Sequence, residues 1–380
     1  MPTQPIWFDA HLDLACLALN RRDMLAPLPA DTAHIGPFAP ASVTLPELAA
    51  GNVRFALATV FSEPDGDDAV GYPAGDFERA AAVGRAQIEA YLTWCDLGRV
   101  SIDLPRCLRA EPGIGEIRGG MGVATVVPPP LEKRVARLTG GSNPPLHIGV
   151  LVENADPIRS PDDLAWWKRN GVCAVGMAWA KSSRYAGGNT TDTGISDLGR
   201  ALVREMDRLG IVHDASHLSD RAFAELLELT DRRIIASHSN CRAIVDPTGT
   251  NQRHLKDEQI KAVVARGGVI GLNLFSKFLR PAGKEGRATI AEAIAHIERV
   301  CDLAGSRIHV GLGSDADGGF SALALPDGIN RPRDFALLTD ALAARGWSDE
   351  EVAGFAWNNW ARFWEKVTSK AAKQRSSNPQ

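Results

Sequence analysis

The chain has 380 residues, of which 44 % are hydrophobic and 23 % charged, and its formal net charge is −4. This composition is ordinary for a globular protein with a full core, and a chain without a basic excess is not expected to bind nucleic acid or an anionic membrane. The six cysteines are scattered singly, which is typical of reduced core residues and not of a disulfide framework.

The two ends of the chain carry weak signals. Residues 1–13 lack a basic stretch followed by an apolar one, and we see no apolar run of about 18 residues in the sequence. We therefore expect no signal peptide, no membrane span and a cytoplasmic location. Residues 369–380 are polar and predict a loose C-terminal tail.

Short apolar runs that end in polar residues recur along the chain, and most are followed by a helix-like segment. Several are continuously apolar, as expected of parallel strands that are buried on both faces. The runs lie at 6–13, 53–61, 147–154, 173–180, 211–217, 234–239, 269–275 and 309–317. Between them, apolar residues at helical spacing, serine caps and terminal glycines predict helices at 197–210, 219–230, 256–268 and 289–305.

Alternation of eight strands with helices predicts a (β/α)8 TIM barrel. The competing open, doubly wound sheet would usually carry a glycine-rich loop after its first strand, where this chain has His11 and Asp13. Residues of about 21–50 and 110–146 are rich in turn-forming residues and predict loop insertions. We therefore expect one catalytic barrel domain over 1–368.

Potential metal ligands stand at the ends of several predicted strands. His11 and Asp13 are two residues apart, so on a strand they face the same side and can hold one ion. Histidine, aspartate or glutamate also closes four later strands, at the end where barrel active sites assemble. These residues are Glu153, His217, His238 and Asp315.

Other histidines are expected to be structural. His213 is the difficult case, because on a helix its spacing from His217 would place two ligands on one face. The segment follows a glycine-terminated helix, so we interpret it as a strand and His213 as structural. The same expectation holds for His34, His147, His296 and His309.

The number of ligands bears on the chemistry. The set His11, Asp13, Glu153, His217 and His238 exceeds what one tetrahedral zinc takes, and suits two zinc ions that share a carboxylate. Two such ions lower the pKa of a bridging water towards ~7, which yields hydroxide at neutral pH. Asp315 is placed to accept the proton and later pass it to the leaving group.

The sequence resembles the membrane (renal) dipeptidase family of zinc peptidases along nearly its whole length, and the spacing of its motifs is specific. The matching pieces include DAHLD (9–13), RLGIVHDASHLSD (208–220), IIASHSN (234–240) and HVGLGSDADG (309–318). The resemblance implies an amidohydrolase-like barrel, often dimeric, that cleaves dipeptides, including ones with a C-terminal D-residue (an activity of the type EC 3.4.13.19).

The resemblance also implies roles for individual residues. His11 and Asp13 would bind one zinc, Glu153 would bridge to the second, and His217 and His238 would complete it. Asp315 would hold the bridging water and carry its proton, and Arg253 would pair with the free carboxylate of a dipeptide substrate.

The residues around the substrate depart from the family pattern. Trp179 stands where a histidine that polarises the scissile carbonyl is usual, Phe275 replaces a tyrosine, and Asn154 follows the bridging glutamate where glycine is usual. Loss of an oxyanion donor can cost ~10²–10³ in rate. Three possibilities stay open: a dipeptidase, a hydrolase of another small amide, ester or lactone, and a metal-binding protein without turnover.

Overall fold

The computed structural model describes residues 5–29, 38–108, 116–118, 125–127, 130–140 and 144–376. His34 lies outside the described residues, as do parts of both predicted insertions. All six cysteines are described and free, so the expectation of reduced thiols is confirmed.

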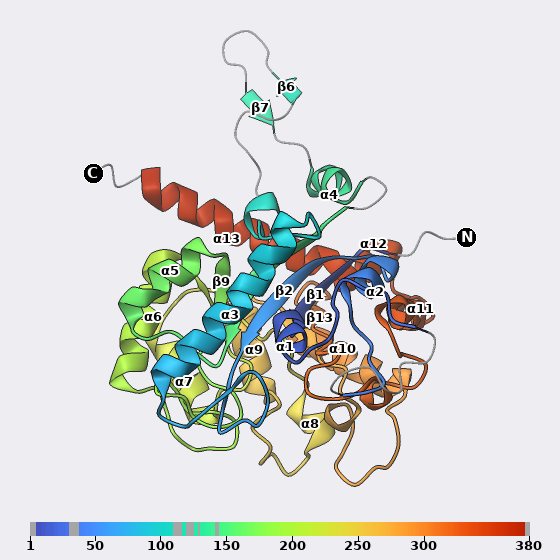
Figure 1. The fold of residues 1–380 in the computed structure, drawn as a ribbon. Helices are drawn as coiled ribbons and strands as arrows, with labels where there is room; N and C mark the ends of the chain where they lie inside the picture. The colour runs from blue at the N-terminus through green and yellow to red at the C-terminus, as the bar shows by residue number, and fades with distance from the viewer. Residues whose placement is uncertain are drawn as a thin grey trace.

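Parallel strands form a nearly closed (β/α)8 barrel, and the predicted fold class is confirmed (Figure 1). The hydrogen-bonded order is β11-β10-β9-β8-β2-β1-β13-β12, and a parallel bridge between Ala236 and Ile270 joins the two outer strands. Each predicted apolar run overlaps one strand, and β8 and β9 begin one residue before their predicted runs. Their bounds are β1 (Trp7–Leu12), β2 (Val53–Phe61), β8 (Leu146–Glu153), β9 (Val172–Gly176), β10 (Val212–Asp214), β11 (Ile234–Ile235), β12 (Ile270–Leu272) and β13 (Val310–Leu312).

Helices surround the barrel (Figure 1). The four predicted helices are confirmed as α6 (Asp197–Leu209), α7 (Asp220–Leu229), α9 (Asp257–Ala265) and α10 (Ile290–Ala304). The others are α1 (Leu14–Leu19), α2 (Leu45–Ala50), α3 (Phe77–Asp96), α4 (Leu131–Thr139), α5 (Leu164–Arg169), α8 (Arg242–Val245), α11 (Ala336–Ala343), α12 (Asp349–Ala353) and α13 (Asn359–Ser376).

Local chemistry explains where the long helices begin and end. The side chains of Ser196, Ser219 and Thr289 accept hydrogen bonds from backbone N–H groups in the first turns of α6, α7 and α10. Gly210 and Gly305 follow α6 and α10 with φ of +68° and +63°, a left-handed conformation that glycine adopts without strain. The turn signals of the sequence therefore operate as predicted.

Short elements lie outside the barrel path. β3 (Glu63–Pro64) pairs with β4 (Gly71–Tyr72), and β5 (Val100–Ser101) pairs with the start of β8. The second predicted insertion contains α4 and the antiparallel pair β6 (Glu116–Arg118) and β7 (Thr125–Val127), which stand at the top of Figure 1.

The C-terminal segment packs against β13. The indole N–H of Trp360 in α13 donates to the carbonyl of Leu312 at 3.0 Å, and the Asn359 amide donates to the carbonyl of Val310 at 2.8 Å. α13 continues to Ser376, into the stretch predicted as a polar tail. Among the described residues, none of the helices combines the length and apolar character needed to cross a membrane.

His296 was predicted to be structural. It lies in α10 and holds the loop that follows β11 by a hydrogen bond. Its Nδ1 accepts the backbone N–H of Cys241 at 3.0 Å, and its Nε2 donates to the carbonyl of Leu279 at 3.1 Å. Both bonds require a neutral ring. Burial lowers the pKa of His296 to about 4, from an ordinary 6.5, and so keeps the ring neutral near pH 7.

We expect this buried ring to make the protein acid-sensitive. The unfolded chain takes up a proton at His296 more readily, so the stability from the neutral ring falls as pH drops from about 6.5 towards about 4. The loss should reach roughly 3 kcal/mol. In urea unfolding, His296→Gln, which keeps one donor and one acceptor, should lose less stability over this range than the wild type. Parallel losses in both proteins would contradict the assignment.

Candidate metal centre

The strand ends bring the predicted ligands to one rim of the barrel. His11 lies within β1, and Glu153 is the last residue of β8. His217, His238 and Asp315 were predicted to close their strands, but β10, β11 and β13 end earlier and these residues occupy the loops that follow. All of them, and Asp13 directly after β1, are buried.

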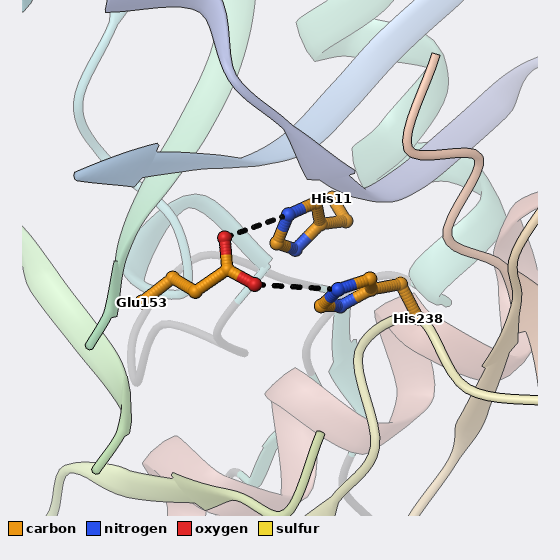
Figure 2. Close-up of side chains that lie close together, drawn as sticks. All are labelled: His11, Glu153 and His238. Atoms are coloured by element: carbon orange, nitrogen blue, oxygen red, sulfur yellow. Dashed lines mark ion pairs between the residues drawn. The ribbon is translucent and has the colours of Figure 1, made fainter. Parts of the chain in front are cut away.

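The carboxylate of Glu153 contacts three histidine rings. Its Oε2 lies 3.3 Å from Nε2 of His11, and its Oε1 lies 3.1 Å from Nε2 of His217 and 3.3 Å from Nε2 of His238. Figure 2 shows the carboxylate between His11 and His238, with one oxygen directed at each ring. Side chains that are far apart in the sequence therefore converge as predicted.

A second group of donors shares His11. Its Nε2 lies 3.8 Å from Oδ1 of Asp13 and 4.0 Å from Oδ1 of Asp315. The donor atoms of His11, Asp13 and Asp315 all lie within 4.8 Å of one another, and so do those of His11, Glu153 and His238. The rim thus offers two adjacent sets of nitrogen and oxygen donors, the types that zinc accepts.

Hydrogen bonds on the far side of two rings fix which nitrogen faces the centre. Nδ1 of His217 donates to Oδ1 of Asn189 at 2.8 Å. Nδ1 of His238 lies 2.8 Å from the hydroxyl of Ser237, whose own proton goes to the carboxylate of Asp214, so the hydroxyl accepts from the ring. Nε2 of each ring is then a bare lone pair directed at the centre.

The arrangement of these atoms fits a cation. Nε2 of His217 and Nε2 of His238 lie 2.9 Å apart, and burial followed by the charge of Arg253 lowers the pKa of His217 to about 4. Burial also lowers the pKa of His238, so both rings are neutral. Oε1 of Glu153 is buried without a hydrogen-bond partner among the described residues. Two lone pairs and an unpaired carboxylate oxygen in contact repel one another unless a cation lies between them.

The carboxyl groups of the site have different proton affinities. Burial would raise the pKa of Glu153, but the positive charge and the hydrogen bond of His11 outweigh it and hold the pKa well below its ordinary value. Burial raises the pKa of Asp315, and the neighbouring carboxylates add to this effect. Glu153 is therefore ionised and suited to bind a cation, whereas Asp315 is suited to take up a proton.

Several polar residues that support the site were not predicted. Thr59 donates its hydroxyl proton to Asp13, and the Asn273 amide donates to Oδ2 of Asp315 at 2.8 Å. Asp9 accepts backbone N–H groups of Ser314 at 2.8 Å and His11 at 3.2 Å. A signal was present: serine directly precedes both His238 and Asp315, and an aspartate precedes His11 by two residues. The further unpredicted residues are Asn189, Asp214 and Ser237.

His213 lies in strand β10, so the strand interpretation is confirmed and the helical alternative is wrong. Its Nε2 lies 2.8 Å from Oδ1 of Asp207, away from the cluster around Glu153. His309 lies at the opposite end of the barrel, where its Nδ1 contacts the carbonyl of Gly268 at 2.7 Å.

Arg253 is held against the candidate centre. It is 5 % exposed, so it is not a surface arginine. One guanidinium nitrogen donates to the carbonyl of His238 at 2.9 Å and another to the hydroxyl of Ser239 at 3.3 Å. Its Nε has no hydrogen-bond partner among the described residues. The charge of Arg253 acts on both His217 and Asp315, so it lies near the reacting region.

Aromatic side chains flank the site. The ring of Trp179 lies 6.0 Å from that of His217 and 5.1 Å from that of Phe61, centroid to centroid. Phe275 stacks on Phe320 at 4.5 Å and meets Phe278 edge-on at 4.8 Å, and the guanidinium of Arg253 lies 5.0 Å from the ring of Phe278. Two groups of aromatic rings, one around Trp179 and one around Phe275, therefore lie beside the predicted substrate residues, and together they form the aromatic wall of the site.

Comparison with known proteins gives concordant results. The profile of the membrane dipeptidase family, peptidase family M19, matches residues 143–378. An uncharacterised dipeptidase of Schizosaccharomyces pombe is 32 % identical over 184 residues, 47 % of this chain and 41 % of the yeast protein. An uncharacterised Klebsiella pneumoniae protein, named for the pqqA 5′ region, is 29 % identical over 214 residues, 54 % of this chain and 76 % of that protein.

A solved structure supports the fold. A metallopeptidase from Rhodobacter sphaeroides, crystallised with a phosphinate mimic of the dipeptide L-Ala-D-Ala, has a TM-score of 0.75 and 23 % identity, covering 96 % of this chain and 100 % of that one. The family profile thus matches more than half of this chain, and the chain has a barrel with potential metal ligands at one rim. The chain belongs to the membrane dipeptidase family of metallopeptidases.

Proposed function

We propose that this chain is a two-zinc hydrolase that cleaves the amide bond of a dipeptide or a similar small amide. In this proposal His11 and Asp13 hold one ion, His217 and His238 hold the other, and Glu153 bridges the two. The observation that carries it is the convergence of three imidazole nitrogens on the two oxygens of Glu153. The proposal includes a cytoplasmic location and, from the family resemblance, a homodimer.

When bound, the two zinc ions supply Lewis acidity and lower the pKa of a water molecule. The remaining steps belong to the chain's own side chains. Asp315, buried and held by Asn273, accepts a proton from the attacking water and passes it to the leaving amine. The hydroxyl of Ser237 and the amide of Asn189 hold His238 and His217 in the tautomers that leave Nε2 free.

Arg253 is the proposed recognition group for the free carboxylate of the substrate. Its guanidinium is already anchored to the backbone at His238, which removes much of the entropy cost of positioning it. Charge-assisted hydrogen bonds to a carboxylate then select small substrates with a free C-terminus. Because the Rhodobacter structure holds a mimic of L-Ala-D-Ala, we include dipeptides with a C-terminal D-residue among the proposed substrates.

The aromatic wall favours a second candidate, hydrolysis of another small amide, ester or lactone. Trp179 lies beside His217, at the sequence position where the family usually has a carbonyl-polarising histidine. Its indole N–H can donate a hydrogen bond, but from a larger and flatter ring. Phe275 offers no hydroxyl. This wall suits a substrate that carries an apolar group and whose carbonyl needs less polarisation than that of a peptide amide. Such a substrate fits the wall better than a simple dipeptide does.

A substrate panel with metal analysis tests the function. Zinc-loaded protein should release amino acids from L,L or L,D dipeptides, and His238→Ala should lose one zinc per chain and at least 10²-fold in kcat/KM. His309→Gln, at the other end of the barrel, is the matched control and should keep both. Turnover of lactones or esters alone would support the second candidate. Bound zinc without turnover of any substrate would reject both.

Arg253→Lys tests carboxylate recognition. The variant keeps the charge but loses the planar fork, so KM for free dipeptides should rise about 10–100-fold. C-terminally amidated dipeptides, which lack the carboxylate, should be cleaved with nearly unchanged KM. Zinc content is measured in parallel because Arg253 also bonds the backbone of His238. An equal change for both substrate types would argue against a carboxylate contact.

Ser237→Ala tests whether the Ser237 hydroxyl holds His238 in the tautomer that binds metal. Without the hydroxyl, Nδ1 of His238 loses its acceptor and the ring is free to place its proton on Nε2. Zinc affinity, measured by competition with a chelator, should fall about 10–100-fold. Ser62→Ala is the control, because the buried Ser62 hydroxyl has no partner among the described residues. Equal zinc affinity in Ser237→Ala and the wild type would show that this hydroxyl does not act on the metal.

A further inference from the structure

A second group of metal-ligand side chains lies at the opposite end of the barrel. His147 stands at the start of β8, the strand whose last residue is Glu153, so the length of the strand separates the two sites. Ser101 of β5 pairs with His147, and Asp103 lies two residues after the end of β5. Cys107 comes one turn later, in the short helix η1 (Arg106–Leu108), where its N–H donates to the carbonyl of Asp103 at 2.9 Å.

Both ring nitrogens of His147 face oxygen acceptors. Nδ1 lies 2.9 and 3.0 Å from the two carboxylate oxygens of Asp103, and Nε2 lies 3.4 Å from the carbonyl of Leu138. A neutral imidazole has one N–H, so it satisfies one of these contacts and directs a lone pair at an oxygen in the other. With the proton on Nε2, the lone pair of Nδ1 faces the carboxylate of Asp103, and a cation beside Nδ1 would bind both groups.

Cys107 completes a set of three different donors. Its sulfur, a carboxylate oxygen of Asp103 and a ring nitrogen of His147 all lie within 4.8 Å of one another. Burial and the charge of Asp103 raise the pKa of Cys107, so the thiol stays protonated in the absence of a cation. A thiolate, an imidazole and a carboxylate are the ligands that zinc takes in proteins.

We propose that Asp103, Cys107 and His147 bind a divalent cation of the zinc type, at a site separate from the candidate metal centre. The side chain of His147 is 6 % exposed and that of Asp103 is 31 % exposed, which leaves a solvent-facing position for water as the fourth ligand. The Nε2–H of His147 then donates to the carbonyl of Leu138, as the second nitrogen of a metal-bound imidazole usually does.

Binding exchanges one proton for one metal–sulfur bond. The S–H bond of Cys107 breaks, its proton goes to solvent, and the thiolate and the Asp103 carboxylate neutralise the dication. No electron transfer is involved. The ion connects η1 to β8 at the N-terminal end of the barrel, the end that serves stability in such folds. We therefore assign it a structural role that does not depend on the proposed hydrolase activity.

Cobalt(II) distinguishes the two sites because a thiolate ligand gives Co²⁺ a strong near-ultraviolet charge-transfer band. Sulfur is absent from the ligand set proposed at the catalytic rim. Titration of metal-free full-length protein with Co²⁺ should therefore produce a band whose final intensity corresponds to one thiolate-bound Co²⁺ per chain, with release of a proton. His238→Ala should keep the band, and Cys107→Ser should lose it together with one bound zinc per chain. Cys301→Ser, which removes a half-buried thiol of α10, should keep both.

Alkylation of the wild-type protein gives an independent result without any variant. Added zinc should slow iodoacetamide modification of Cys107 at least tenfold relative to chelator-treated protein, with Cys301 as the internal reference. Absence of the thiolate band while Co²⁺ binds elsewhere, or equal alkylation with and without zinc, would show that Asp103, Cys107 and His147 bind no cation and that Asp103 and His147 only contact each other. Failure of the dipeptide panel would leave this site unaffected.

Discussion

The structure depends on one unfavourable contact, that of the buried Oε1 of Glu153 with the Nε2 atoms of His217 and His238, which carry no proton towards it. Each buried polar atom without a partner costs about 1–3 kcal/mol, and Oε1 of Glu153 is such an atom among the described residues. The fold maintains the contact because His217 and His238 are anchored on their far sides by Asn189 and Ser237. Cation binding removes the repulsion, so the free energy of metal binding contributes to the stability of the folded protein.

Apolar runs predicted eight strands, and polar residues at their ends predicted the rim, because the carboxyl ends of parallel strands in a barrel must meet. The predicted ends of β10 and β11 lie several residues beyond the observed ends, because the residues that follow these strands stay buried after the backbone has left the sheet. His217, for example, has a φ of +67°, which is not a strand conformation. The link from Asp214 to Ser237 was not predicted. It requires the pairing of Asp214 with Ile235, and continuously apolar parallel strands do not specify their register.

The departures from the family pattern fall into two physical classes. Asn154 has φ +66°, a left-handed conformation that glycine adopts freely and that asparagine tolerates better than most residues. Its amide also donates to the carbonyl of Ser62 at 2.8 Å, so the replacement is compatible with the position of Glu153. In the proposed function, Trp179 and Phe275 instead change the surface that a substrate would meet. The proposed ligands thus keep their common geometry beside an altered aromatic surface, although Trp179 lies 6.0 Å from the ring of His217.

Strand β8 carries a potential ligand at each end, His147 at the start and Glu153 at the close. The two ends differ in chemistry, in line with the roles proposed for them. Thiolate sulfur donates more charge to a cation than imidazole does, and it suits an ion that holds chain segments together. Imidazole and carboxylate leave the ion a stronger Lewis acid, which suits polarisation of a substrate carbonyl. The donor types at the two ends therefore separate a proposed structural ion near Cys107 from proposed catalytic ions at the rim, although one strand connects them.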